Sequence, residues 1–343
     1  MSNRLPGLVA LFVALAPAIV GAAAPAGATL SAAQNAVLQA DGPRALALLG
    51  ALHPASAAEA RQRVCMAARL QDRPSFPAAR TTGHPLPDAV LRAYRHYWRE
   101  ALDPAHRAAA EKALFADLRR LTDQPAQATR DALQDAVSAR LAALGLHSRL
   151  GRTAELYDLM LYFREDERRY PVLLPDGQRE TVRVFLMRDL VSGGWARHLN
   201  CGGPGTGGFA TDEGLYAVAD AYDLDDESFR INFLAHESQH YADYKRLPGL
   251  QGPELEYRAK LVELAQAEQT LAKTLRAFVA NQGDDRANPH AWANRRVLAA
   301  LAQRLKLAEP ERLVDAAADE VRAAARAVLV QDNAERGIPA PVQ

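Results

Sequence analysis

The chain has only two cysteines, Cys65 and Cys201, among its 343 residues. Two thiolates are too few for a zinc cluster built on cysteine. Its formal net charge is zero, so it lacks the overall basic field that attracts nucleic acid, and it has no acidic tail. Beyond the N-terminus, no apolar run is long enough to span a bilayer. We therefore expect no nucleic-acid partner and no membrane span in the mature chain.

The N-terminus has the pattern of a secretory signal peptide. A positive charge at Arg4 precedes an apolar run from Leu8 to Val20, and small residues at 26–28 form an A-x-A cleavage site. The run is short for a membrane span and contains Pro17, although an uncleaved anchor is the alternative. No cysteine follows it, which argues against a lipoprotein. We predict a signal peptide over residues 1–28, cleavage after Ala28, and a periplasmic or secreted protein.

Export would place both cysteines in an oxidising compartment. One disulfide between Cys65 and Cys201 would join an early helix to a glycine-rich loop. Two free thiols are the alternative.

The hydrophobic pattern predicts a predominantly helical α+β protein. Residues 29–165 show apolar residues at helical spacing, with Asp or Pro often just before each run. Residues 166–343 begin with alternating polarity around Pro175-Asp176-Gly177, which predicts a β-hairpin pairing Tyr170–Leu174 with Thr181–Met187. A strand over 215–222 and helices near 228–244, 254–280, 289–307 and 310–331 are expected to follow. The helical region of residues 29–165 is available to bind a protein partner.

The strongest chemical signal is His236-Glu237-x-x-His240. Histidines four apart lie on one face of a helix, where both can reach one metal ion. A glutamate between them can take a proton from a metal-bound water. The pattern is the H-E-x-x-H zinc signature, and we predict Zn²⁺ as the cofactor. The alternative is a pair of core or solvated histidines without metal.

A zinc site needs a third protein ligand. The variant with glycine and histidine downstream is excluded, because Asp243 and Arg246 occupy those positions. The next helix offers three candidates, Glu254, Glu256 and Glu263. We favour Glu256 because a small residue, Ala259, lies three positions on and permits close helix approach, with Glu263 second.

The stretch 209–260 resembles the gluzincin-type zinc metallopeptidases, and its sharp motif is the H-E-x-x-H. The resemblance implies a zincin-like domain over residues 166–343, with a small β-sheet packed on the histidine helix. It assigns His236, His240 and Glu256 as ligands and Glu237 as general base, and it implies that a strand edge near Gly208–Ala210 holds the substrate. Many members carry an acidic residue four positions after the ligand glutamate, where this chain has Lys260. This departure either argues against Glu256 or indicates a different second shell, in which Asp243 could orient a histidine.

Such an enzyme also benefits from a donor to the oxyanion. His290 is our first candidate for this catalytic role, and three tyrosines in the same region, Tyr241, Tyr244 and Tyr257, are the others. A structural role is the alternative for each.

Two other chemistries are weaker. Residues 203–208 match G-x-G-x-x-G, but strand-like sequence follows them where a dinucleotide site needs a helix. We interpret them as a flexible loop over the site. Cys201 near His198, or Ser192, lacks the context of a nucleophile.

These observations predict an exported zinc metallopeptidase. It would hydrolyse peptide or amide bonds through a zinc-bound water activated by Glu237, on a peptide, protein or peptidoglycan-type substrate. The alternative is an exported helical scaffold or binding protein with a structural or absent metal site. A fourth ligand, Asp243 or Glu263, would favour a structural site.

Overall fold

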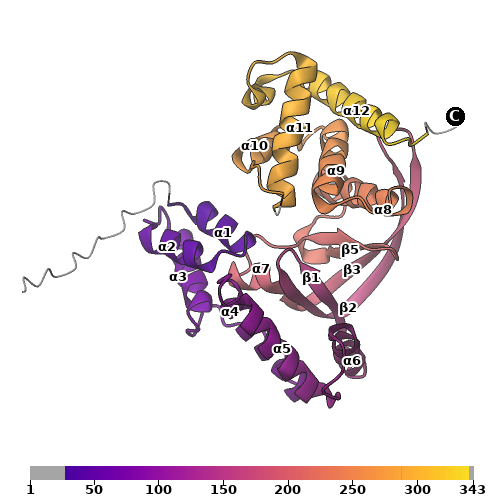
Figure 1. Ribbon diagram of the computed structural model, residues 1–343. Helices are drawn as coiled ribbons and strands as arrows, with labels where there is room; N and C mark the ends of the chain where they lie inside the picture. Colours follow the sequence, from indigo (N-terminus) through magenta and orange to yellow (C-terminus); the bar gives the residue numbers. More distant parts are fainter. Residues whose placement is uncertain (1–27, 287, 340–343) are drawn as a thin grey trace, which may run out of the picture.

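The computed structural model describes residues 28–286 and 288–339. The predicted signal peptide therefore lies outside the described residues, apart from Ala28. The described part is α+β and mostly helical, as the sequence predicts, with one curled sheet of five strands (Figure 1). None of the described helices is long and apolar enough to cross a membrane.

Six helices come first along the chain, and four of them begin at a residue whose side chain caps the helix. They are α1 (Leu30–Leu38), α2 (Gly42–Ala51), α3 (Ala57–Leu70), α4 (Pro85–Ala101), α5 (Arg107–Thr122) and α6 (Arg130–Ala142). Thr29, Asp41, Ser56 and Thr129 cap four of them by accepting a backbone N–H. Their apolar faces form a first core around Trp98, which is fully buried.

The strands form a sheet in the order β1-β2-β3-β5-β4. They are β1 (His147–Thr153), β2 (Leu156–Leu173), β3 (Arg179–Gly193), β4 (Gly208–Ala210) and β5 (Leu215–Val218). All neighbours are antiparallel except β3 and β5. The predicted hairpin is confirmed, but its pairing differs from the prediction: Tyr170 lies opposite Val182 and Leu173 opposite Arg179, whereas Met187 lies opposite Glu165.

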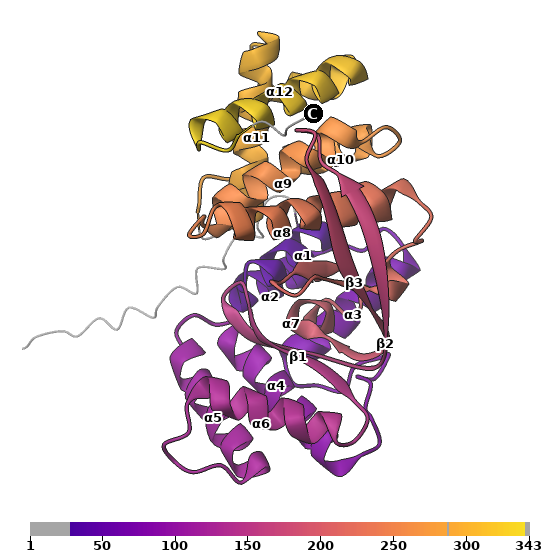
Figure 2. The ribbon, with the colours of Figure 1, turned by 90° about the vertical axis from the view of Figure 1, so that its right-hand side faces the viewer.

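The prediction of helix up to residue 165 is wrong beyond Ala142. Residues 147–165 belong to β1 and the first half of β2, whose opening seven residues from Leu156 are all buried. This stretch is apolar except for Asp158, so it carries no clear period that separates strand from helix. The hairpin is therefore longer than the sequence indicated, and it reaches from the N-terminal helices to the C-terminal ones (Figure 2).

The C-terminal half is helical, with one short helix placed before it. The elements are α7 (Gly194–Leu199), a 3₁₀ turn (Ala219–Ala221), a π-helical stretch (Ser228–Ala235), α8 (His236–Arg246), α9 (Gly252–Gln266), α10 (Leu271–Ala280), α11 (Pro289–Leu305), a second 3₁₀ turn (Pro310–Asp315) and α12 (Ala318–Glu335). The prediction of a strand over 215–222 holds only to Val218, and the predicted helix over 310–331 starts as the second 3₁₀ turn.

The single helix predicted over 254–280 is two helices. The chain turns out of α9 at Ala267, which is extended, and the carboxylate of Glu227 accepts the backbone N–H groups of Glu268, Gln269 and Thr270. This carboxylate comes from a distant part of the chain, so local periodicity did not reveal the break.

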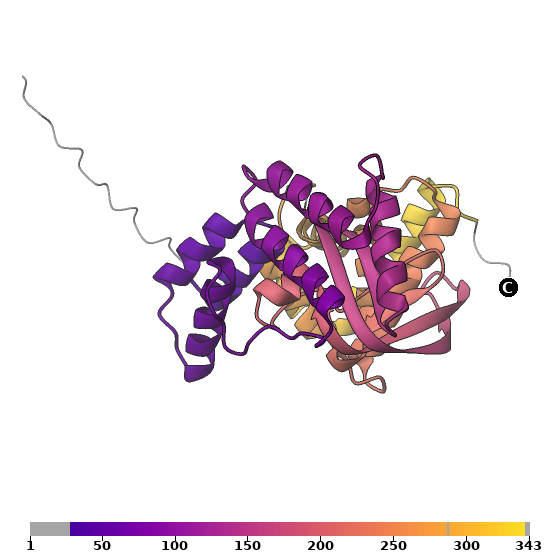
Figure 3. The ribbon, with the colours of Figure 1, turned by 90° about the horizontal axis from the view of Figure 1, so that it is seen from below.

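Three groups of buried residues hold these layers together. The first core joins the N-terminal helices to the start of β2 (Figure 3). The second packs α9, α11, α12 and the π-helical stretch against one face of β3 and β5. The third lies on the opposite face of the sheet and includes Phe185 and Tyr216. Helix α8 packs over the β4 end of the sheet, where the predicted site lies.

Candidate metal centre

The two histidines of the motif face one another on α8. The predicted helix over 228–244 is confirmed as one helical run, and its first two turns are π-helical. His236 and His240 are both buried, and their Nε2 atoms lie 3.1 Å apart. The helix is anchored beneath them by Phe229 and Phe233, which are buried in the second core.

Helix α9 brings one carboxylate to this pair. Oε1 of Glu256 lies 3.3 Å from Nε2 of His240, and Oε2 lies 3.6 Å from Nε2 of His236. Ligand atoms of the three residues all lie within 4.8 Å of one another. The close approach of the helices is permitted by Ala259, which is fully buried.

These distances fit a zinc ion. Tetrahedral bonds of about 2.0–2.1 Å place ligand atoms roughly 3.3–3.4 Å apart. The three closest approaches, 3.1, 3.3 and 3.6 Å, bracket that value. Two imidazole nitrogens and one carboxylate are also a donor set that zinc accepts with a fourth position left open. The residues present therefore fit the predicted cofactor.

Glu263, our second candidate for a ligand, lies behind the first histidine instead. Its Oε1 is 2.6 Å from Nδ1 of His236, and its Oε2 accepts a hydrogen bond of 2.7 Å from Asn232. An Nδ1–H that donates to a carboxylate leaves Nε2 free as a ligand, which is how a second shell orients a metal-binding histidine. The sequence held a weak signal for this contact, because Glu263 follows Glu256 by two helical turns.

The same contact sets the charge of the site. Burial alone would lower the pKa of His236, but the carboxylate of Glu263 outweighs it and raises the pKa to about 9. In return, although burial opposes it, His236 lowers the pKa of Glu263. In the metal-free protein the ring of His236 therefore carries a second proton on Nε2, and a metal ion would bind by displacing that proton while the Nδ1–H stays bonded to Glu263.

The suggestion that Asp243 orients a histidine is wrong. Its carboxylate is held by Arg258, at 2.7 and 3.0 Å, and by the side-chain amide of Gln239. Arg258 is fully buried and also contacts Asp332 and Asn333 of α12. The network ties α8, α9 and α12 together, so Asp243 is not available as a fourth ligand.

A histidine and a lysine lie beside Glu256. Nδ1 of His290 lies 2.9 Å from its Oε2, and Nζ of Lys260 lies 3.9 Å from the same atom. Burial opposes ionisation, but His290, His240 and His236 hold the pKa of Glu256 well below its usual range. Lys260, which departs from the family pattern, thus adds a positive charge beside the ligand. Glu254 points elsewhere and pairs with Arg286.

The carboxylate of Glu237 is half-buried beside the ligands, and among the described residues it makes no hydrogen bond or ion pair. Burial first, and then this carboxylate, raise the pKa values of Tyr222 and Tyr244. Tyr244 is 43% exposed and lies parallel to the ring of His240 at 6.4 Å. Both phenols stay protonated near neutral pH and can donate a hydrogen bond close to the base. Tyr222 was not predicted from the sequence, because all the predicted donors lie within or after the motif helix and Tyr222 precedes it.

The other predicted donors are placed differently. Tyr241 lies under Lys245, and Tyr257 lies under Arg296. His290 is 63% exposed and contacts the proposed ligand glutamate directly. Its role as oxyanion donor stays a prediction.

Strand β4 is the open edge of the sheet beside α8. Gly207 accepts from the N–H of Val218, and Thr211 donates to Gly214. Because hydrogen-bonding groups alternate along an antiparallel pair, Phe209 pairs inward with Tyr216, while the backbone groups of residues 208 and 210 point outward. A Cβ on Gly208 would lie 2.2 Å from the ring of Phe233, so glycine lets this edge approach the helix.

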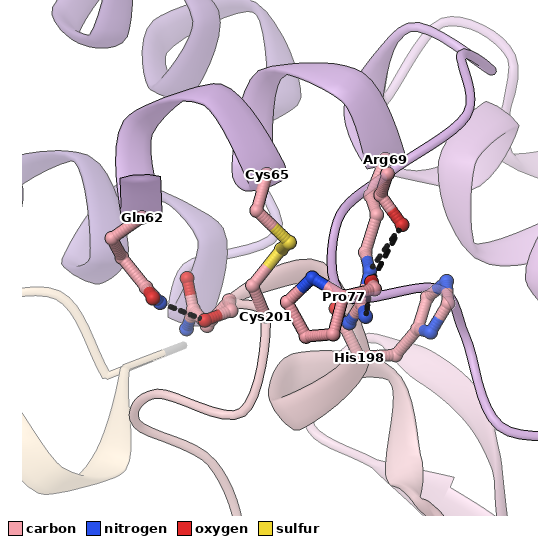
Figure 4. The surroundings of a disulfide bond; sticks show 8 residues. Gln62, Cys65, Arg69, Pro77, His198 and Cys201 are labelled. Carbon is pink, nitrogen blue, oxygen red and sulfur yellow. Dashed lines mark hydrogen bonds between the residues drawn. A yellow bond between two sulfur atoms is a disulfide. The ribbon is translucent and has the colours of Figure 1, made fainter. Parts of the chain in front are cut away.

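The glycine-rich segment before β4 starts at Cys201, which forms a disulfide with Cys65 (Figure 4). The alternative of two free thiols is therefore wrong. Side chains of α3 also cap the end of α7, because Gln62 and Arg69 donate to the carbonyls of Asn200 and His198. Helix α7 ends just before this segment and was not predicted from the sequence. The glycines allow close packing, since a Cβ on Gly205 would lie 2.8 Å from the backbone nitrogen of Arg197.

A nucleophilic site is absent from this region. Cys201 is oxidised to the disulfide, and Ser192 is buried. His198 packs against Trp98, and burial lowers its pKa to about 2, with further contributions from nearby arginines. The ring is therefore neutral and packs against the first core through Trp98.

Comparison of the chain with protein families, with curated proteins and with solved structures gave no match. The functional argument therefore depends on the geometry of the site alone.

Proposed function

We propose that the protein is an exported zinc-dependent metallopeptidase that hydrolyses peptide or amide bonds. The observation that carries the proposal is the convergence of His236, His240 and Glu256 beside an unpaired carboxylate, Glu237. Zinc in this position would polarise a carbonyl and lower the pKa of a bound water. The residues around it supply the remaining chemistry.

Glu237 is the general base of the proposed reaction. Its carboxylate has no partner among the described residues to compete for a proton, and it is next in sequence to His236. It takes a proton from the attacking water and passes it to the leaving amine. The neighbouring phenol of Tyr222 or Tyr244 is a donor for the developing oxyanion.

The open edge at β4 is the proposed substrate platform. The outward N–H and C=O groups of Gly208 and Ala210 can pair with an extended peptide as an added strand. Helix α8 packs along this strand, so a chain bound there would run beside the proposed metal ligands. An extended polypeptide fits this edge better than a compact ligand.

Two features support export. The N-terminal sequence has the signal-peptide pattern, and the disulfide is of a kind that persists in oxidising compartments.

The three-ligand geometry favours a catalytic site over the scaffold alternative. Both candidates for a fourth ligand are engaged elsewhere, Asp243 with Arg258 and Glu263 with Nδ1 of His236. Structural zinc sites have four protein ligands, whereas catalytic sites keep one position for water.

The test combines metal analysis with a single isosteric change. The mature wild type, Glu237→Gln and His236→Ala are purified, supplied with zinc, dialysed and assayed for metal and for cleavage of a mixed peptide library. We expect about one zinc per chain in wild type and Glu237→Gln and a loss in His236→Ala, with cleavage falling roughly 10²–10⁴-fold in Glu237→Gln.

Full cleavage by Glu237→Gln would remove the general base from the argument. If the wild type held no stoichiometric metal after zinc was supplied, the proposed zinc site would be refuted and the scaffold alternative would stand.

A further inference from the structure

Three aromatic rings form a row across the sheet on the face opposite the second core. Phe185 of β3, Tyr216 of β5 and Phe209 of β4 are directly opposite one another in the strand register. Phe185 and Tyr216 stack with centroids 4.7 Å apart, and Tyr216 and Phe209 stack at 5.2 Å. The planes differ by only 16° and 17°, so each ring continues the orientation of the last.

The first two rings are covered and the last is not. The guanidinium of Arg183 lies over Phe185 at 4.8 Å, and that of Arg149 lies over Tyr216 at 3.8 Å. Arg149 is held there by Glu165 and Glu213. Within residues 28–286 and 288–339, no cation lies over Phe209, which is half-buried on the edge strand. The row therefore ends in a ring with an unused side at the open edge.

Strand geometry determines what an added peptide would place beside that ring. A new strand lies about 4.7–4.9 Å from its neighbour, close to the spacing of the existing rings. Since the backbone groups of Phe209 point inward to β5, the residue opposite it in an added antiparallel strand forms a non-hydrogen-bonded pair. Such pairs bring side chains closest, with Cβ atoms roughly 4.5–5.5 Å apart, on the same face of the sheet.

We propose that Phe209 determines substrate specificity by stacking on an aromatic residue of an extended peptide bound along β4. The bound side chain becomes the fourth ring of the row Phe185–Tyr216–Phe209. This inference rests on the proposed peptidase function and names the substrate class: polypeptide segments that carry Phe, Tyr or Trp at one fixed position relative to the cleaved bond.

The test uses the full mature chain loaded with zinc and a mixture of peptides of defined sequence. Cleavage products of the wild type are sequenced, and residue frequencies are aligned on the cleaved bond. A peptide with the preferred aromatic residue and its alanine analogue are then compared in wild type, Phe209→Leu and Phe209→Tyr. Phe163→Ala is the matched control, because Phe163 is an exposed phenylalanine on β2, away from this edge.

We expect one position enriched in aromatic residues in the wild type. In Phe209→Leu, which keeps an apolar side chain but no ring, kcat/KM for the aromatic peptide falls roughly twofold to tenfold. The loss lies in KM, since a stack made equally in the ground state and the transition state leaves kcat unchanged. Phe209→Tyr retains the preference, and the alanine analogue is cleaved equally by all variants.

Cleavage without an aromatic preference, a preference for arginine, or a preference that survives Phe209→Leu would overturn the inference and leave the peptidase intact. Failure of the zinc-loaded wild type to cleave any peptide would overturn the proposed function, and the inference with it.

Discussion

The contact between Glu263 and His236 gives the sharpest test of the metal centre. One oxygen of Glu263 is 2.6 Å from Nδ1 of His236 and the other receives the amide of Asn232 at 2.7 Å. Glu263→Gln keeps the shape but offers one acceptor where the carboxylate offered two. Its amide must face either the ring N–H or the Asn232 donor, and the negative charge that favours a metal-bound imidazole is lost.

The expected effect is a weaker zinc site in a folded protein. Loss of an outer-shell partner typically lowers metal affinity about 10–100-fold, or about 1.4–2.7 kcal/mol. A charged hydrogen bond in a buried site is worth a similar amount, about 1.5–3 kcal/mol, so the two estimates agree. The dissociation constant is measured at pH 7.5 by competition with a chromophoric chelator.

Glu268→Gln is the matched control, because Glu268 is an exposed glutamate five residues further along the chain. Urea unfolding in excess chelator shows whether either variant is destabilised without metal. A zinc affinity of Glu263→Gln within twofold of the wild type would refute the assignment of Glu263 as the group that orients His236.

Two further predictions concern stability. The double variant Cys65→Ala/Cys201→Ala releases a cross-link between residues 136 apart and should lower the free energy of unfolding by up to about 5 kcal/mol, seen as a lower urea midpoint; an unchanged midpoint would contradict it. Burial opposes ionisation of Glu227, but the N–H groups of residues 268–270 hold its pKa below the ordinary value. The contribution of this carboxylate to the free energy of unfolding is therefore complete above pH 5, and it disappears as the pH falls through the lowered pKa. Glu227→Gln should cost about 1–3 kcal/mol at pH 7 and flatten the loss of stability between pH 5 and pH 3, and a parallel decline in both proteins would count against this role.

Several features followed from local sequence. His236 and His240 share a helix face because four residues make about one turn. The turn at residues 175–177 placed the hairpin at the right point of the chain, because such turns restrict the backbone directly, but it did not fix the register of the strands. Helix starts were predictable where a side chain such as Ser56 caps its own helix within three residues.

Other features depended on how distant segments meet. The sequence left three glutamates as candidates for the third ligand, and the crossing of α8 and α9 gave each of them a different partner. It turned Glu256 toward the Nε2 atoms, Glu263 toward Nδ1 and Glu254 toward Arg286. Residues on one helix differ in their rotation about the helix axis and in their position along it. Sequence spacing alone therefore does not identify which of them faces another helix until the packing angle of the two helices is known.

The strands at residues 147–165 and the break after α9 were missed for a related reason. A buried apolar run becomes strand because β3 lies beside it, and α9 ends where Glu227 arrives from a distant loop. The sequence alone thus determined that the two histidines face one another on one helix, since spacing within one helical turn is a local property. Only the tertiary structure decided which glutamate faces the two histidines, which one contacts Nδ1 of His236, the disulfide and the position of Phe209 on the open edge, because each depends on contacts between residues far apart in the chain.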